Sequence, residues 1–245
     1  MHVIPLMPPD EEKEGIHMKK YSISILCALL ALVLCGAAVA ETVYVTISDG
    51  QGRLVLCNAA VEVTDVDADG ALTVNDALYA AHEAAFEGGA EAGYATADTG
   101  YGPSITMLWG EENGGSYGYY VNDASAYSLA DPVSDGDYLN AFVYTDLEAW
   151  SDQYCTFDVK RVEVAAGTSL ELTLNMVVFD ENWNPVSMPV EGAIITVDGE
   201  DTAFVTDAEG KVQLTLDVAG DHLISAHSDA ANLVPPACTV TVTEA

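Results

Sequence analysis

The chain has 245 residues, half of them hydrophobic, and it carries 39 acidic side chains against only 7 basic ones, a formal net charge of −32 at pH 7. A negative field of this size repels nucleic acid and anionic membrane surfaces, so both are excluded as partners. It favours solubility and attracts divalent cations, although a solvated acidic surface explains most of these charges equally well.

Residues 18–40 have the order of a secretory signal peptide. A basic start is followed by an apolar run over 23–33 and by the small-x-small cleavage site Ala38-Val39-Ala40. A transmembrane anchor fits less well, because this run is about half of the ~20 apolar residues that a span needs. Lipid attachment at Cys35 also fits less well, because no small residue precedes it. We expect a secreted chain that begins at Glu41 and is not an integral membrane protein once processed.

Residues 1–17 are interpreted as a mis-called start. Lys13-Glu14-Gly15 can be encoded by AAGGAGGN, a ribosome-binding sequence, and two further codons separate it from Met18. We therefore expect Met18 to be the true start and the source to be bacterial. The mature chain, residues 41–245, then holds 35 acidic and 4 basic side chains, a net charge of about −31.

The first half of the mature chain, residues 41–156, combines several strands with one helix. Apolar and aromatic runs predict strands at 43–47, 60–64, 105–109, 117–121 and 138–144. The helix is expected at 74–86, with a buried face made by Leu78, Ala81, Ala85 and Phe86. This pattern is typical of an α+β domain in which one helix packs on a sheet.

The segment that precedes the helix has the spacing of a calcium-binding loop. Counted from position 1, the ligand positions 1, 3, 5, 7, 9 and 12 fall on Asp65, Asp67, Asp69, Ala71 through its carbonyl, Thr73 and Asp76. Gly70 at position 6 allows the sharp bend, and Leu72 at position 8 is expected to point to the core. We expect one Ca²⁺ here. The pattern resembles the calcium loop of dockerins, which ends in Asp where EF-hands place Glu.

An acidic turn in front of a helix explains the same residues without a metal. Thr73 and Asp76 form a Thr-x-x-Asp capping box, and Asp-Ala-Asp-Gly is a common turn. Both interpretations can hold together, because position 9 of such a loop is also the N-cap of the helix. Since only one loop is present, we expect a structural role for the ion.

Gly114 to Gly118 match the G-x-S-x-G nucleophile motif of hydrolases, with Ser116 as the candidate nucleophile. That chemistry requires a strand, a sharp turn and then a helix. The strand-like sequence YGYYVN follows Ser116 instead, so we expect no catalysis and no enzyme.

Four residues near these glycines form a candidate ligand site: Trp109, Tyr117, Tyr119 and Asn122. Aromatic faces can stack on a planar ligand, and Asn122 can both donate and accept hydrogen bonds. Alternation along a strand places Tyr117 and Tyr119 on one face and Tyr120 on the other. Packing in the core is the alternative for each ring.

Part of this half resembles the transcobalamin-C-terminal-like domain of bacterial secreted proteins. The resemblance covers residues 43–144 and rests on the strand Tyr119-Tyr120-Val121-Asn122 and on the turn Gly136-Asp137. It implies a small β-grasp-like fold and raises the alternative of an extracellular carrier for a corrinoid-like small molecule.

The second half, residues 157–245, reads as an antiparallel β-sandwich. Apolar residues alternate with polar ones over 170–178, 212–218 and 240–242, which is the period of half-buried strands. Turn dipeptides such as Asp198-Gly199 and Glu209-Gly210 separate the runs at short intervals.

The order VEGAIITVDG, FVTDAEGKVQLTL, VAGDHLISAHS and PPACTVTVTEA in this half resembles the Ig-like and carboxypeptidase-regulatory-like domains of bacterial surface proteins. The resemblance implies an Ig-like sandwich that acts as a spacer or an adhesion support.

The mature chain has three cysteines, Cys57, Cys155 and Cys238. Export permits one disulfide, and we predict Cys155–Cys238, which would join the first and last segments of the sandwich. Three buried free thiols are the alternative.

These observations predict a secreted, non-enzymatic binding or structural protein with a calcium-stabilised interaction domain. The expected partner is an extracellular protein or a small molecule, and the alternative function is the corrinoid-like carrier.

Overall fold

The structure is a computed structural model that describes residues 40–100 and 102–244. The expected mis-called start and signal peptide lie outside the described residues. Seventeen strands and two helices are present in the described part, so the chain is mostly β, as predicted. Neither of these helices has the length and hydropathy that a membrane span requires.

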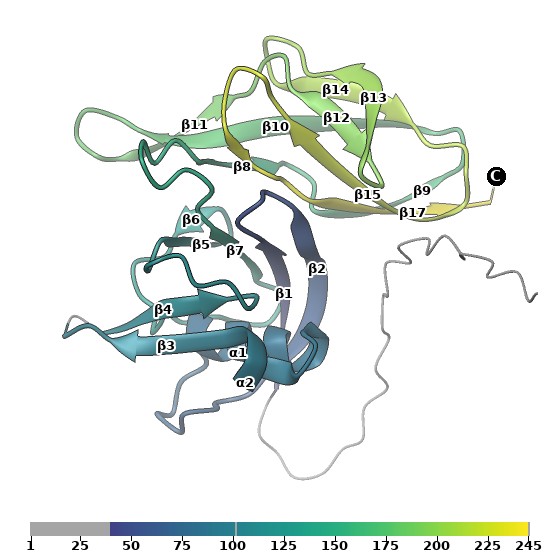
Figure 1. The fold of residues 1–245 in the computed structure, drawn as a ribbon. Helices are drawn as coiled ribbons and strands as arrows, with labels where there is room; N and C mark the ends of the chain where they lie inside the picture. Colours follow the sequence, from purple (N-terminus) through teal and green to yellow (C-terminus); the bar gives the residue numbers. More distant parts are fainter. Residues whose placement is uncertain (1–39, 101, 245) are drawn as a thin grey trace, which may run out of the picture. The chain divides into compact units, whose positions relative to one another are not determined.

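The first half contains β1 (Glu41–Ser48), β2 (Leu54–Val63), α1 (Val74–Ala85), α2 (Gly89–Gly93), β3 (Tyr94–Asp98), β4 (Pro103–Leu108), β5 (Tyr117–Val121), β6 (Ala124–Ser125) and β7 (Tyr138–Val143). Five of the strands form one sheet in the order β2-β1-β7-β5-β6, while β3 and β4 form a separate hairpin (Figure 1). The central pair β1 and β7 is parallel and the other pairs are antiparallel. This is the α+β, β-grasp-like arrangement that was predicted, with one correction: the short helix α2 was not foreseen.

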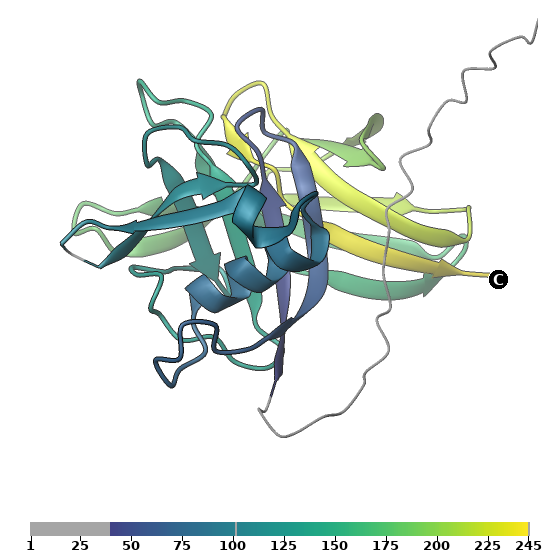
Figure 2. The ribbon, with the colours of Figure 1, turned by 60° about the horizontal axis from the view of Figure 1, so that its bottom comes forward.

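The core of this half lies between the sheet and α1. Val43, Val45 and Ile47 alternate along β1 and are fully buried, because strand side chains point to opposite faces in turn. Helix α1 packs against β1 and β2 (Figure 2). Its buried residues include Leu78 and Ala81, as predicted.

The predicted helix face was wrong at its C-terminal end. Ala85 is exposed and Phe86 is only half-buried. Phe86 is the C-cap, where the backbone turns to an extended conformation (φ −86°, ψ 141°), so the helical repeat no longer directs its side chain to the sheet. Ala85 is the last residue of the helix and is exposed at its end. Val74, Ala77 and His82 complete the buried face instead.

The second half contains β8 (Gln153–Phe157), β9 (Arg161–Ala165), β10 (Ser169–Phe179), β11 (Pro185–Pro189), β12 (Ile194–Val197), β13 (Glu200–Val205), β14 (Lys211–Thr215), β15 (Gly220–His227), β16 (Leu233–Val234) and β17 (Cys238–Thr243). One sheet has the order β11-β10-β8-β16, with β14 also paired to β10, and the other has the order β13-β12-β15-β17-β9 (Figure 1). Their inner faces share one hydrophobic core, as in a β-sandwich.

Two details of the predicted sandwich are corrected. It is not wholly antiparallel, because β16 pairs with β8 and β9 pairs with β17 in parallel. The alternating run at 212–218 is also shorter in the structure, since β14 ends at Thr215 and the side chain of Val218 is exposed.

Cys155 and Cys238 are not joined by a disulfide, so this prediction was wrong. Both side chains are buried in the sandwich core, where they pack as small apolar groups. The Cys155 thiol donates a hydrogen bond to the Val234 carbonyl oxygen at 3.0 Å. Burial raises the pKa of both thiols, that of Cys238 to about 12, which keeps them protonated and unreactive.

The described residues group into one compact unit, and specific contacts join its two halves. The Asn58 side-chain amide donates to the Lys160 carbonyl oxygen at 3.0 Å. The Lys160 ammonium forms an ion pair with Asp123 at 2.9 Å. Strand β8, which spans the boundary expected after residue 156, pairs with β10 and β16 of the sandwich.

Candidate metal centre

The capping box predicted at the start of α1 is confirmed. Thr73 is the N-cap, and its hydroxyl accepts a hydrogen bond from the Asp76 amide at 3.3 Å. In return, one carboxylate oxygen of Asp76 accepts from the Thr73 amide at 2.9 Å and from the Thr73 hydroxyl at 2.6 Å. Asp76 has no exposed surface, so this carboxylate is a fixed part of the fold.

The second oxygen of Asp76 closes the loop in front of the helix. It accepts from the Val66 amide at 2.9 Å, which ties the beginning of the loop to the first turn of α1. Gly70 bends the chain with φ of 91°, and Ala68 also has a positive φ of 61°. The glycine at position 6 therefore serves the bend that a calcium loop requires.

Residues 129–133 brace the other end of the loop. The carbonyl oxygen of Leu72 accepts from the Val133 amide at 2.9 Å, and the Val74 amide donates to the Asp131 carbonyl at 3.0 Å. The Leu72 side chain packs against the core of the first half, as expected for position 8. This brace was missed in the sequence, because nothing local to 129–133 indicates a partner more than fifty residues earlier.

Three carboxylates converge at this loop. Asp65, Asp67 and Asp76 each offer one oxygen, and these oxygens all lie within 4.8 Å of one another. Desolvation raises the pKa of Asp67, and the like charges of neighbouring aspartates add to this increase, while a hydrogen bond from the Asp69 amide opposes it. A bound cation would relieve the repulsion among these charges. A donor set made only of carboxylate oxygens suits a hard cation such as Ca²⁺.

The remaining predicted ligands are arranged differently. The Asp69 carboxylate accepts from the Ala71 amide at 2.8 Å and does not belong to the group of three converging carboxylates. The Thr73 hydroxyl is engaged with Asp76. Three of the four predicted carboxylates are thus assembled around one point, whereas Asp69 bonds within the loop and Thr73 bonds at the helix start.

The predicted ligand residues of β5 take part in internal contacts. Tyr117 and Tyr119 pack against the core of the first half, whereas Tyr120 belongs to a separate cluster on the other face, so the predicted alternation is confirmed. The Tyr117 hydroxyl lies 2.8 Å and 2.9 Å from the carbonyl oxygens of Thr106 and Glu111. Tyr117 therefore holds the segment between β4 and β5, which contains Glu111, close to β4.

Asn122 lies in the two-residue turn between β5 and β6. Asn122 and Asp123 have φ of 49° and 65°, the signature of a type I′ hairpin turn. The Asn122 side chain donates to the Asp137 carboxylate at 2.7 Å and accepts from the Tyr138 amide at 3.0 Å. Its hydrogen-bonding groups are therefore used within the fold.

Trp109 contacts neither Tyr117 nor Asn122 through a hydrogen bond or ring contact among the described residues. Its ring lies 5.2 Å from the ring of His82 and 5.2 Å from that of Phe86. The structure thus divides the predicted ligand site among a loop, a turn and an aromatic cluster at the end of α1.

Ser116 does not lie in a nucleophile elbow. It is buried and leads directly into strand β5, as the strand-like sequence predicted. Its amide donates to the Asn113 side chain at 2.9 Å. Gly118, the last glycine of the motif, faces the Phe142 ring of β7, and a Cβ at this position would overlap that ring. The glycines of this motif therefore serve packing and turns.

Comparisons with known proteins add little to this geometry. No protein-family model matches the chain, and a search of curated proteins finds no similar sequence. Neither comparison supports the likeness to transcobalamin C-terminal-like domains or to dockerins. Among solved structures, the teleost fish polymeric Ig receptor (pIgR) ectodomain is similar with 15% identity and a TM-score of 0.22. The match covers 55% of this chain and 65% of the receptor chain, slightly less than two thirds. At so low a TM-score the likeness supports no inference about the role of this chain.

Proposed function

We propose that this protein is an extracellular, non-catalytic binding or structural protein whose first half is stabilised by one Ca²⁺. The observation that carries the proposal is the convergence of Asp65, Asp67 and Asp76 on one point directly before α1. The signal-peptide pattern of residues 18–40 and the large negative charge agree with an extracellular location, where calcium is abundant.

Calcium at this point would stabilise the first half through Asp76. That carboxylate already links the loop to the first turn of α1, and α1 covers the sheet. An ion that binds only the folded loop shifts the folding equilibrium by mass action, by about 2.7 kcal/mol when its concentration is a hundred times Kd. The role is structural, because the ion would hold the entry to the helix.

The partner we propose is an extracellular protein or small molecule that tolerates a strongly acidic surface. The corrinoid-like carrier needs an exposed aromatic platform at Trp109, Tyr117 and Tyr119. All three side chains are half-buried against the core of the first half and none of them is fully exposed, so we propose no carrier role. No catalytic role is proposed either.

Calorimetric melting with and without Ca²⁺ tests the calcium proposal. We expect the melting temperature to rise with millimolar Ca²⁺ in the natural protein and to stay unchanged in Asp65→Asn. Asp69→Asn is the matched control, because it removes an equal charge two to four residues away, from a carboxylate outside the converging group. It should keep most of the calcium response.

An equal response in both variants would show that calcium acts through the general negative charge. No response in the natural protein would leave the loop as an acidic capping turn. Mg²⁺ at the same concentration should give a smaller shift, since Mg²⁺ loses its water reluctantly.

A further inference from the structure

A second candidate site lies away from the calcium loop, in a cavity of about 270 Å³. A volume of this size suits a small ligand. Five aromatic side chains and one carboxylate contribute to its lining: Tyr120, Tyr144, Trp150, Tyr154, Phe179 and Asp152.

The aromatic rings form two packed pairs. Tyr120 stacks on Tyr154 with ring centroids 3.7 Å apart and an angle of 6° between the rings. Tyr144 contacts Trp150 at 5.3 Å with an angle of 59°. Tyr120 and Tyr154 cover one face of each other and Tyr154 is buried, so Tyr144, Trp150 and Phe179 are the rings left for an occupant. Because the face of an aromatic ring is negative, these rings favour a positively charged occupant over a negative one.

Asp152 adds a full negative charge to the lining. Its carboxylate is nearly buried and accepts from the Thr145 amide at 2.9 Å, the Thr145 hydroxyl at 2.7 Å and the Asp146 amide at 2.9 Å. These partners are neutral, so they satisfy the hydrogen-bonding capacity of the Asp152 carboxylate without neutralising its charge. None of the basic residues in the described part of the chain lines the cavity, and each has a partner: Arg53 pairs with Asp49, Lys211 pairs with Glu171, and Arg161 lies over Tyr44. The Lys160 ammonium is paired with Asp123, which also accepts from the hydroxyl of the lining residue Tyr154 at 2.8 Å.

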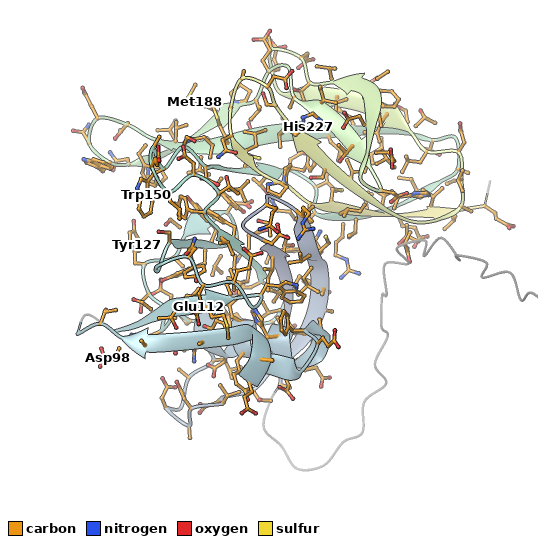
Figure 3. The ribbon with its side chains drawn as sticks, viewed as in Figure 1. Asp98, Glu112, Tyr127, Trp150, Met188 and His227 are labelled. Carbon is orange, nitrogen blue, oxygen red and sulfur yellow. The ribbon has the colours of Figure 1, made fainter. Side chains whose placement is uncertain are left out.

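Trp150 is held out on a firmly built loop between β7 and β8 (Figure 3). Its backbone has φ of 54°, which a bulky residue rarely adopts, and its side chain is 55% exposed. Asp146 fixes the loop by accepting from the amides of Glu148 and Ala149 and from the Ser151 hydroxyl. The loop therefore keeps the Trp150 indole ring partly in solvent, although burying this apolar ring would be favourable.

We infer that this cavity binds a small organic ammonium ion, best a quaternary one with a trimethylammonium group. An inorganic cation would lose water oxygens that ring faces cannot replace. An alkylammonium ion is weakly hydrated, can contact several rings at once, and can lie near the Asp152 carboxylate. The cavity shares no residue with the calcium loop, so this inference stands apart from the proposed calcium role.

Titration calorimetry with choline and with its neutral isostere 3,3-dimethylbutan-1-ol tests the inference, with sodium chloride holding the ionic strength constant. We expect choline to bind at one site and the neutral alcohol to bind about tenfold more weakly or not at all, since the two differ mainly in charge. Equal binding of the two compounds would overturn the inference, and so would the absence of choline binding.

Variants at two exposed aromatic residues place the site. Trp150→Leu should weaken choline binding about tenfold, whereas Tyr127→Leu is the matched control, because Tyr127 is 89% exposed and does not line the cavity. Phe179→Leu, a change at a half-exposed ring of the lining, provides a second variant should Trp150→Leu fold poorly. Choline binding that survives both lining variants would also overturn the inference.

Discussion

The protonation state of His82 is set by its surroundings, because this side chain has no exposed surface. Its Nδ1 lies 2.6 Å from the Leu78 carbonyl oxygen, and its Nε2 accepts from the Trp109 amide at 3.0 Å. A carbonyl oxygen can only accept, so Nδ1 carries the proton and the ring is neutral. Burial lowers the pKa of His82, although the hydrogen bond to Leu78 opposes this.

His82 should make the protein less stable as the pH falls. Below the ordinary histidine pKa of about 6.5, the unfolded chain takes up a proton that the folded ring resists. The contribution of His82 is therefore complete above that pH and declines towards the lowered folded-state pKa, at up to about 1.4 kcal/mol per pH unit. Urea unfolding of the natural protein and of His82→Gln between pH 5 and 7.5 measures it.

The difference in the free energy of unfolding between the natural protein and His82→Gln should shrink as the pH falls. Taking the difference cancels the contribution of His222, whose effect has the opposite sign. Burial lowers the pKa of His222, but its hydrogen bonds to Asp198 and to the Val218 carbonyl, together with the nearby negative charges, raise it overall. A difference that stays constant with pH would contradict the assignment of His82 as the buried neutral group.

At this scale, sequence reasoning succeeds where the interacting residues are close in the chain. Thr73 and Asp76 are three residues apart, and their capping box was predicted from that spacing. The contact of His82 with Trp109 spans 27 residues and has no local signature.

Elements with a strong alternation of apolar and polar residues were predictable. The long strand β10 and the two faces of β5 followed directly from that pattern. Helix α2 and strand β11 were not predicted. The sequence of α2 is GAEAG, which is poor in apolar residues, and all five residues of β11 are exposed. An edge strand without a buried face leaves no alternation to detect.

The pairing of β5 with β7 depends on one glycine. A Cβ at Gly118 would overlap the Phe142 ring directly across the strand pair. We expect Gly118→Ala to reduce the free energy of unfolding by about 1–3 kcal/mol, the usual cost of overpacking a core. Chemical denaturation measures this cost.

A double-mutant cycle isolates the contact between the methyl group and the ring. In a Phe142→Leu background, Gly118→Ala should cost clearly less, because the smaller side chain leaves room for a methyl group. Equal costs in both backgrounds would show that the cost does not come from the contact with the ring.

For the whole molecule, the dominant property is its charge. Residues 41–245 hold 35 acidic side chains and 4 basic ones, and each basic side chain already has an acidic or aromatic neighbour. The remaining carboxylates repel one another across the surface, which favours solubility and opposes the compact state. The sequence predicts this charge fully, and the loop spacing pointed to the three carboxylates that converge, together with Asp69, which is not among them.

Salt should therefore stabilise the protein. The screening length falls from about 30 Å at 0.01 M salt to about 8 Å at 0.15 M, so repulsion between exposed carboxylates weakens while buried hydrogen bonds are little affected. We expect the melting temperature to rise with sodium chloride in the absence of calcium. A fall would mean that the few ion pairs matter more than the repulsion.

The central claim is a single calcium ion at Asp65, Asp67 and Asp76, and titration calorimetry with Ca²⁺ at physiological salt tests it most directly. The structure predicts saturable binding of one ion per chain, lost in the double variant Asp65→Asn, Asp67→Asn and retained in Asp69→Asn. Physiological salt screens the general attraction of Ca²⁺ to an acidic surface, so saturation would mark a specific site. No saturable binding in the natural protein, or equal binding in the double variant, would contradict the claim.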